Sequence, residues 1–96
     1  MLRPGFCTTT TYAPASCATA DLGGWPLSTA EVASWPVAEE ACRARCALCA
    51  RCNWFSVSLK HRDCSWFHAC DLGRLRNDVA GFRSAAIGAY LSLIHI

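Results

Sequence analysis

Eight cysteines in 96 residues are the feature that most constrains the fold of this chain. Six of them fall between Cys42 and Cys70, and Cys42, Cys46 and Cys49 recur at the i, i+4, i+7 spacing of one helix face. A core this small is marginal by itself, and small secreted domains gain stability from disulfides. Because the number of cysteines is even, complete pairing is possible. The sequence therefore predicts a disulfide-stapled domain from an oxidising, extracellular environment.

Composition excludes several other classes of protein. Hydrophobic residues make up 53% of the chain and charged residues 17%, which rules out an intrinsically disordered chain. A formal net charge of +2 is too small to argue for a nucleic-acid partner. No apolar stretch approaches the roughly 20 residues of a spanning helix, so we expect no membrane contact from this segment.

The two ends of the sequence suggest a fragment of a longer secreted or cell-surface protein. No apolar signal-peptide region precedes Cys7, so we expect that Met1 is not the natural start. Residues 91–96 resemble the translation of a mosaic-end adapter used in transposase-based sequencing libraries. We therefore expect 91–96 to be a non-native tail, the alternative being a short apolar C-terminal strand.

Residues 37–50 are predicted to form a helix. Pro36 suits the first helical turn, because its missing N–H would be unpaired there in any case. Glu39 precedes Arg43 by four residues, which is the favourable order for an ion pair along a helix. Small side chains on the cysteine-bearing face would let this helix lie close to a sheet.

A strand is predicted over residues 53–59, because apolar and polar side chains alternate there. Phe55 and Val57 point to one face, whereas Ser56 and Ser58 point to the other.

Further strands are predicted at 64–68 and 82–87, with a short edge strand near 8–12, whereas 22–26 has the composition of a turn. A polar connection of hairpin length, residues 60–63, joins the first two strands. The predicted fold class is α+β: a small disulfide-rich domain with one helix packed on a short antiparallel sheet.

The helix-to-strand segment resembles the PAN/apple domain. Cys42, Cys46 and Cys52 have the C-x3-C-x5-C spacing of that family and are followed by Phe-Ser, and Cys64 takes the place of its later strand cysteine. The resemblance divides the chain into an irregular N-terminal segment, 1–21, and an apple-like domain, 22–90, followed by the tail.

The resemblance also implies a disulfide scheme. In apple modules the first helix cysteine bonds the strand cysteine, and the second bonds the cysteine just after the helix. These pairs carry over to Cys42–Cys64 and Cys46–Cys52. Cys49, which shares the helix face of Cys42, is then assigned to Cys70, and this leaves Cys7–Cys17 as the last pair.

Zinc and redox chemistry are the alternatives for the cysteines. Cys46, Cys49 and Cys52, together with Cys64, Cys70 or His68, could supply four zinc ligands, but cysteines on one helix face do not converge easily on one ion. The Cys49-x-x-Cys52 motif lies at the helix C-terminal end, where the dipole does not favour a thiolate. No catalytic motif is present, so we expect neither an enzyme nor a cofactor.

A candidate binding surface combines basic and aromatic side chains near the helix and the hairpin. It comprises Arg43, Arg51, Trp54, Lys60, Arg62 and Trp66. Tryptophan faces can stack on a sugar or a partner protein, whereas the alternative is that the arginines are solvated and the tryptophans form core. The family resemblance implies non-catalytic recognition of protein or carbohydrate; the alternative is a structural or regulatory spacer beside an extracellular enzyme domain.

Overall fold

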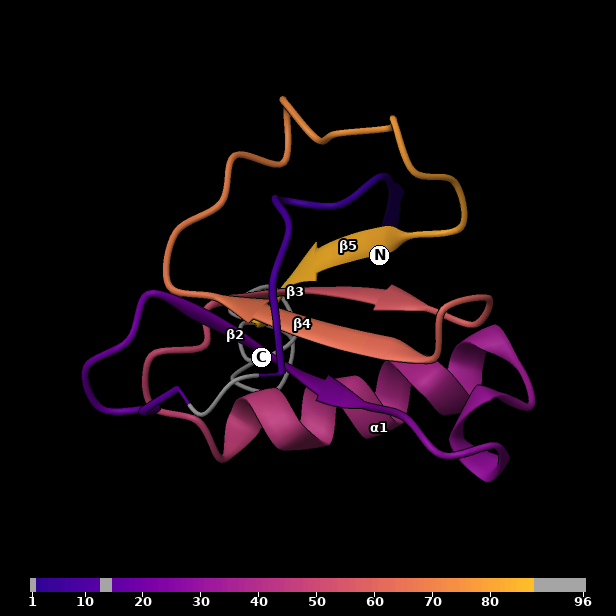
Figure 1. The fold of residues 1–96 in the computed structure, drawn as a ribbon, viewed down its shortest axis with the longest axis horizontal. Coiled ribbons are helices and arrows are strands. Elements are labelled where there is room, and N and C mark those ends of the chain that lie inside the picture. Colours follow the sequence, from indigo (N-terminus) through magenta and orange to yellow (C-terminus); the bar gives the residue numbers. More distant parts are fainter. Residues whose placement is uncertain (1, 13–14, 88–96) are drawn as a thin grey trace, which may run out of the picture.

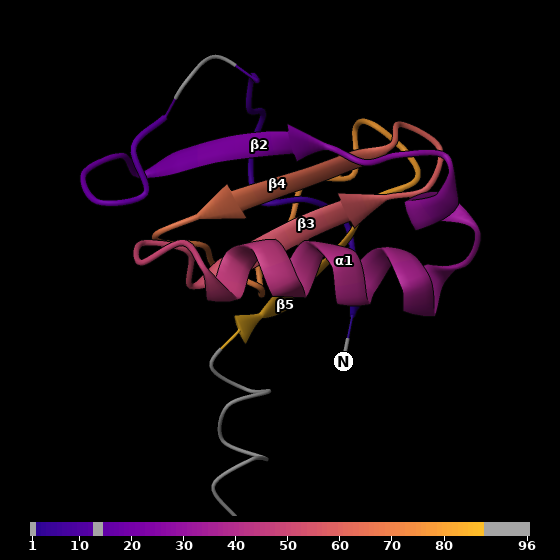
Figure 2. The same ribbon diagram turned by 90° about the horizontal axis from the view of Figure 1, so that it is seen from below.

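One α-helix lies across one face of an antiparallel sheet in the computed structural model, which describes residues 2–12 and 15–87 (Figures 1 and 2). The sheet of that part of the chain has five strands in the order β1-β5-β3-β4-β2. Their bounds are β1 Arg3–Pro4, β2 Leu22–Pro26, β3 Trp54–Ser58, β4 Asp63–Phe67 and β5 Arg83–Ala86. This arrangement confirms the predicted α+β class, and the expected tail at 91–96 lies outside the described residues.

The helix α1 (Trp35–Ala47) begins and ends earlier than the predicted 37–50. Ser34 caps its start, with extended backbone and a side-chain oxygen that accepts a hydrogen bond from Val37 N at 3.4 Å. It ends at Ala47 because the Cys46–Cys52 disulfide needs the chain to reverse, whereas six more helical residues would advance it by about 9 Å. Cys49 therefore lies beyond the helix, so only two of the three expected cysteines, Cys42 and Cys46, lie on the helix face.

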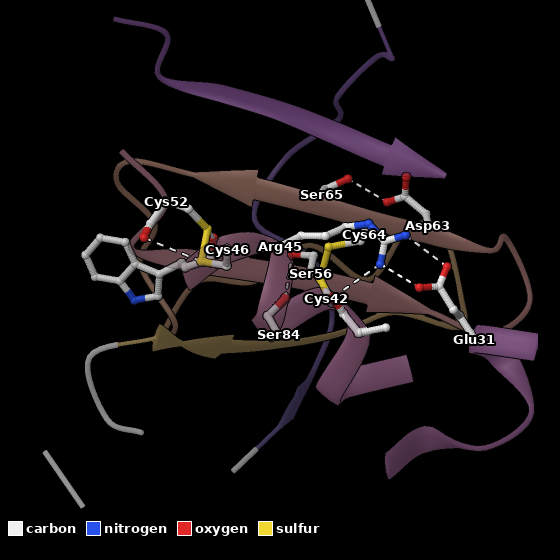
Figure 3. Close-up of a disulfide and its surroundings, with 12 residues drawn as sticks. Glu31, Cys42, Arg45, Cys46, Cys52, Ser56, Asp63, Cys64, Ser65 and Ser84 are labelled. Atoms are coloured by element: carbon white, nitrogen blue, oxygen red, sulfur yellow. Dashed lines mark hydrogen bonds and ion pairs between the residues drawn. A yellow bond between two sulfur atoms is a disulfide. The ribbon is translucent and has the colours of Figure 1, made fainter. Parts of the chain in front are cut away.

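The core lies between α1 and the sheet. Ala38, Cys42 and Cys46 are the buried residues of the helix, and they pack among the buried side chains of the facing strands. Those side chains include Phe55, Val57, Cys64, Trp66 and Ala85. The Cys42–Cys64 disulfide joins the helix to β4 within this core (Figure 3).

A short 3-10 helix η1 (Ala30–Val32) precedes α1 and is joined to it by an ion pair. Ser28 and Glu31 form a reciprocal capping box, with Ser28 N donating to Glu31 Oε1 at 2.9 Å and Glu31 N to Ser28 Oγ at 3.2 Å. Arg45 of α1 donates to both carboxylate oxygens of Glu31, at 2.8 and 2.9 Å (Figure 3). The hydrogen bond from Arg45, followed by the one from Ser28, lowers the pKa of Glu31 to about 2.

Two of the four expected disulfides are confirmed and two are wrong. Cys42–Cys64 and Cys46–Cys52 are present, but Cys7 bonds Cys70 and Cys17 bonds Cys49. The described part of residues 1–21 is therefore fastened covalently to the rest of the domain at two points.

The strand predictions fail at the N-terminal side of the sheet. Residues 22–26, expected as a turn, form the edge strand β2 against β4. A Cβ on Gly23 would overlap Trp66 Nε1 and lie 2.8 Å from Trp66 Cε2, so this glycine makes room for the indole rather than for a turn. Residues 8–12, expected as an edge strand, pair with no strand and instead cross the face of the sheet opposite α1.

Candidate functional site

A row of serines runs across the face of the sheet that α1 does not cover, here called the outer face. Ser84 of β5 pairs in register with Ser56 of β3, and Ser56 pairs with Ser65 of β4. All three are buried, and the hydroxyls of Ser56 and Ser84 are 2.7 Å apart (Figure 3). Buried hydroxyls need partners, so something polar must cover this face.

The cover is residues 5–12, here called the N-terminal strap, which cross the strands along the serine row. The strap contacts each serine in turn: Ser84 Oγ donates to Gly5 O at 2.8 Å, Cys7 N donates to Ser56 Oγ at 3.2 Å, and Thr10 Oγ1 lies 2.6 Å from Ser65 Oγ. Figure 1 shows this N-terminal trace on the side of the sheet away from α1. Small hydroxyl side chains let the strap backbone approach the sheet while they satisfy its polar groups.

The strap is anchored at its start by backbone bonds and by a disulfide. Gly5 N donates to Phe82 O at 2.8 Å, and Phe6 and Arg76 exchange two backbone hydrogen bonds of 3.0 and 2.8 Å. Gly5 has φ 110°, and a Cβ there would lie 2.8 Å from Leu75 Cβ, so glycine is required at this crossing. The Cys7–Cys70 disulfide then fixes the strap to the chain that leaves β4.

A pocket of about 360 Å³ opens between the strap and the loop that leads into β5. Its walls include strap residues 8–12, Asp63, Ser65, His61, Val79 and Phe82. This volume is at the lower end of the usual range for ligand sites, so the pocket suits one side chain or one sugar unit.

Asp63 lies at the inner wall of the pocket and is only 7% exposed. Tyr12 Oη donates to Asp63 Oδ1 at 2.7 Å. Ser65 Oγ donates to Asp63 Oδ2 at 2.5 Å (Figure 3). Burial, followed by the hydrogen bond and the charge of Asp63, raises the pKa of Tyr12 to about 12. The strap thus supplies a neutral phenol donor to a buried carboxylate.

Aromatic rings form another part of the pocket lining. The ring of Phe82 lies 5.1 Å from Phe6 and 5.3 Å from His61, the latter in a stacked arrangement with an interplanar angle of 14°. His61 Nε2 is 3.2 Å from Ala80 O, and the guanidinium of Arg76 lies 5.2 Å from the centre of the Phe6 ring. One carboxylate, several hydroxyls and an aromatic wall are together suited to non-covalent binding.

The candidate surface proposed from the sequence does not assemble. Trp66 is 1% exposed and stacks on Trp25 at 6.2 Å, so its assignment to a binding surface is wrong; the indole fills the core beside Gly23. Trp54 is half-buried at the start of β3. Lys60 lies in the turn at the other end of the same strand.

The arginines of that candidate surface have partners within the molecule. Arg43 bonds Glu39 at 2.8 Å, as predicted from their spacing, and its guanidinium lies over Phe55. Arg51 bonds Ala20 O at 2.7 Å and Asp21 at 2.6 Å, which fastens the chain before β2 to the chain before β3. Arg62 reaches Thr29 Oγ1 at 3.1 Å.

Sequence reasoning missed the residues that do meet at the pocket. Asp63 and His61 were assigned to a connecting turn, and 8–12 to an edge strand. The run of four threonines after Cys7 is the signal that could have indicated a polar segment, but its position over β4 depends on contacts some 50 residues away in sequence, such as Tyr12 with Asp63.

Thiolate chemistry has no basis in this arrangement. All eight cysteines are in disulfides, so the thiolates that the zinc and redox alternatives require are absent. Cys49 and Cys52 bond different partners rather than each other.

The chain matches no protein-family model, and searches of curated proteins and of solved structures return no match. Among residues 2–12 and 15–87, no helix combines the length and the apolar character needed to cross a membrane.

Proposed function

We propose that this chain is a non-catalytic recognition module of the PAN/apple type, which acts outside the cell and binds a protein or carbohydrate ligand in the strap pocket. The observation that carries the proposal is the pocket itself, whose lining combines a buried carboxylate, aromatic rings and a covalently anchored strap. The four disulfides support an oxidising compartment. The Cys42–Cys64 and Cys46–Cys52 pairs support the apple-like relation between helix and sheet.

The hydrogen bonding of the pocket supports binding rather than catalysis. The Asp63 carboxylate accepts from two hydroxyls, and the His61 ring has a backbone carbonyl, not a pocket hydroxyl, as its hydrogen-bond partner. A serine–histidine pairing is therefore not formed by His61, and the serine that donates to Asp63 is itself buried, 4% exposed, with its oxygen 2.6 Å from Thr10 Oγ1 of the strap.

The test is a binding screen of the oxidised chain on an array of neutral and acidic glycans and a panel of purified matrix proteins. Val79 is exposed at the pocket rim, so Val79→Trp should fill the pocket and abolish binding. Leu48→Trp is the matched control, because Leu48 is 89% exposed at the end of the helix on the other face of the sheet. Binding that survives Val79→Trp, or no binding to any probe, would contradict the proposal and favour the spacer alternative.

A further inference from the structure

The most buried carboxylate in residues 2–12 and 15–87 has no cationic partner. Asp63 is 7% exposed, and within residues 2–12 and 15–87 no lysine, arginine or histidine forms an ion pair with it. The acids that do form ion pairs in that part of the chain have side chains that are at least 28% exposed. Burying a carboxylate is costly and is normally offset by a positive partner.

The neighbouring basic residues are directed elsewhere. The guanidinium of Arg62 bonds Thr29, and His61 stacks on Phe82 with its Nε2 beside Ala80 O. Neutral hydroxyls, from Tyr12 and Ser65, are the partners that Asp63 has. The carboxylate has about four lone-pair positions, and these two donors leave acceptor capacity for a third group.

The pocket walls suit a positive group as well. Aromatic faces attract cations through the ring quadrupole. The pocket lining includes the rings of Phe82 and Phe6, whose centres lie 5.1 Å apart. Threonines of the strap place further hydroxyl acceptors around the opening.

An ammonium fits the carboxylate better than a guanidinium does. Tyr12 holds Oδ1 and Ser65 holds Oδ2, so both oxygens are already engaged from separate directions. The planar fork of an arginine needs both oxygens side by side, whereas an ammonium can donate to one carboxylate oxygen and to nearby hydroxyls. A neutral sugar could use the same hydroxyls but would not supply the missing charge.

We propose that the strap pocket binds an alkylammonium group, either the side chain of a lysine on a protein partner or a free amine, with its nitrogen at Asp63 and its methylene chain along Phe82. This inference rests on the proposed recognition function and names the chemistry of its ligand.

Titration calorimetry with three probes tests it. N-acetyl-lysine methylamide represents a lysine within a protein, n-butylamine a free amine, and N-acetyl-norleucine methylamide a neutral analogue of the first. An ammonium probe should bind at least about tenfold more tightly than the neutral analogue, because a charge-assisted bond to a buried carboxylate is lost in the latter. If N-acetyl-lysine methylamide binds more tightly than n-butylamine, the ligand is a lysine on a protein; the reverse order indicates a free amine.

Two variants locate the charge. Asp63→Asn keeps the shape and the acceptor for Tyr12 but removes the charge, so the preference for ammonium should fall at least about tenfold. Glu40→Gln removes one charge from an exposed helix position and should leave binding unchanged.

Equal affinity for the lysine and norleucine probes would overturn the inference, and this comparison needs only the unaltered chain should Asp63→Asn fail to fold. Binding of a neutral glycan that Val79→Trp abolishes, without any preference for ammonium, would refute the ammonium ligand yet leave the recognition function standing. If Val79→Trp leaves ammonium binding unchanged, the pocket is not the binding site, and both proposals are contradicted.

Discussion

The pKa values of Glu31 and Tyr12 are shifted in opposite directions by the surroundings of each side chain. Arg45 and Ser28 stabilise the charged form of Glu31 and lower its pKa to about 2, whereas burial and Asp63 disfavour the charged form of Tyr12 and raise its pKa to about 12. Both shifts make the stability of the fold depend on pH, one in acid and one in base.

In acid, the stability contributed by Glu31 should be fully present above its ordinary pKa of 4.5 and be lost as the pH falls toward about 2. Glu31→Gln should flatten this dependence, and its cost at neutral pH should stay under about 1 kcal/mol because the pair is solvent-accessible. Urea unfolding midpoints between these pH values measure both effects. Glu40→Gln, as the control, should retain the dependence of the unaltered chain; equal slopes for the two variants would show that Glu31 is not responsible.

In base, the contribution of Tyr12 should be present below its ordinary pKa of 10.0 and be lost as the pH rises toward about 12. Asp63→Asn should lower the pKa of Tyr12 only in part, because burial is the larger cause and remains. The absorbance of tyrosinate measures this in a Tyr90→Phe background, which leaves Tyr12 as the single tyrosine. An unchanged midpoint in Asp63→Asn would contradict the hydrogen bond between the two side chains.

At the scale of elements, local sequence patterns predicted the helix and the strands that are determined mainly by interactions between nearby residues. Helix α1 and strands β3, β4 and β5 were predicted near their observed positions, because capping, helix spacing and alternation are written into adjacent residues. Strand β2 was mistaken for a turn, because its Gly-Gly-Trp-Pro composition is explained only by the Trp66 indole packed beside Gly23. A contact with a residue so distant in sequence leaves no local signal.

Gly23→Ala should destabilise the domain by about 1–3 kcal/mol, because the new methyl group would overlap the buried Trp66 ring. Gly24→Ala is the matched control on the other face of the strand, where a Cβ would lie 3.2 Å from Thr10 Oγ1 at the strap. Urea midpoints of the two variants should differ, with Gly23→Ala the lower. If the two are equally stable, the indole does not require glycine at this position.

At the scale of the whole molecule, the strap explains why half of the disulfides and most of the pocket escaped prediction. Alternation correctly assigned Ser56 and Ser58 to one face of β3, but nothing in the strand shows that this face is covered. The cover depends on Cys7 reaching Cys70, a pairing across 63 positions that spacing does not reveal. Asp63 becomes a site residue only when the strap brings Tyr12 over it.

Removal of the Cys7–Cys70 disulfide by a double serine substitution should cost about 4 kcal/mol in the chain-entropy model for a loop of this length. Hydrogen exchange should rise first at the strap amides of Gly5, Phe6 and Cys7, while the α1 amides stay protected. The double serine variant of Cys17 and Cys49 should leave strap protection in place. Loss of strap protection in that control instead would show that the second disulfide holds the strap.

The sheet includes a strand, β5, that no disulfide connects to the rest of the domain. Strand β5 lies between β1 and β3, yet the eight cysteines lie at positions 7 to 70, before it. A trypsin cut after Lys60 would be spanned by Cys42–Cys64 and Cys7–Cys70, so the two pieces should migrate together until they are reduced.

A cut after Arg74, whose side chain is 87% exposed, would be spanned by no disulfide. The piece that carries β5 could then leave, and the edge of β3 would open. Gels run with and without reductant after limited digestion should separate these two events; joint migration after the second cut would contradict this topology. The domain should therefore stay in one piece after a cut in the turn between β3 and β4, but lose β5 after a cut in the loop before that strand.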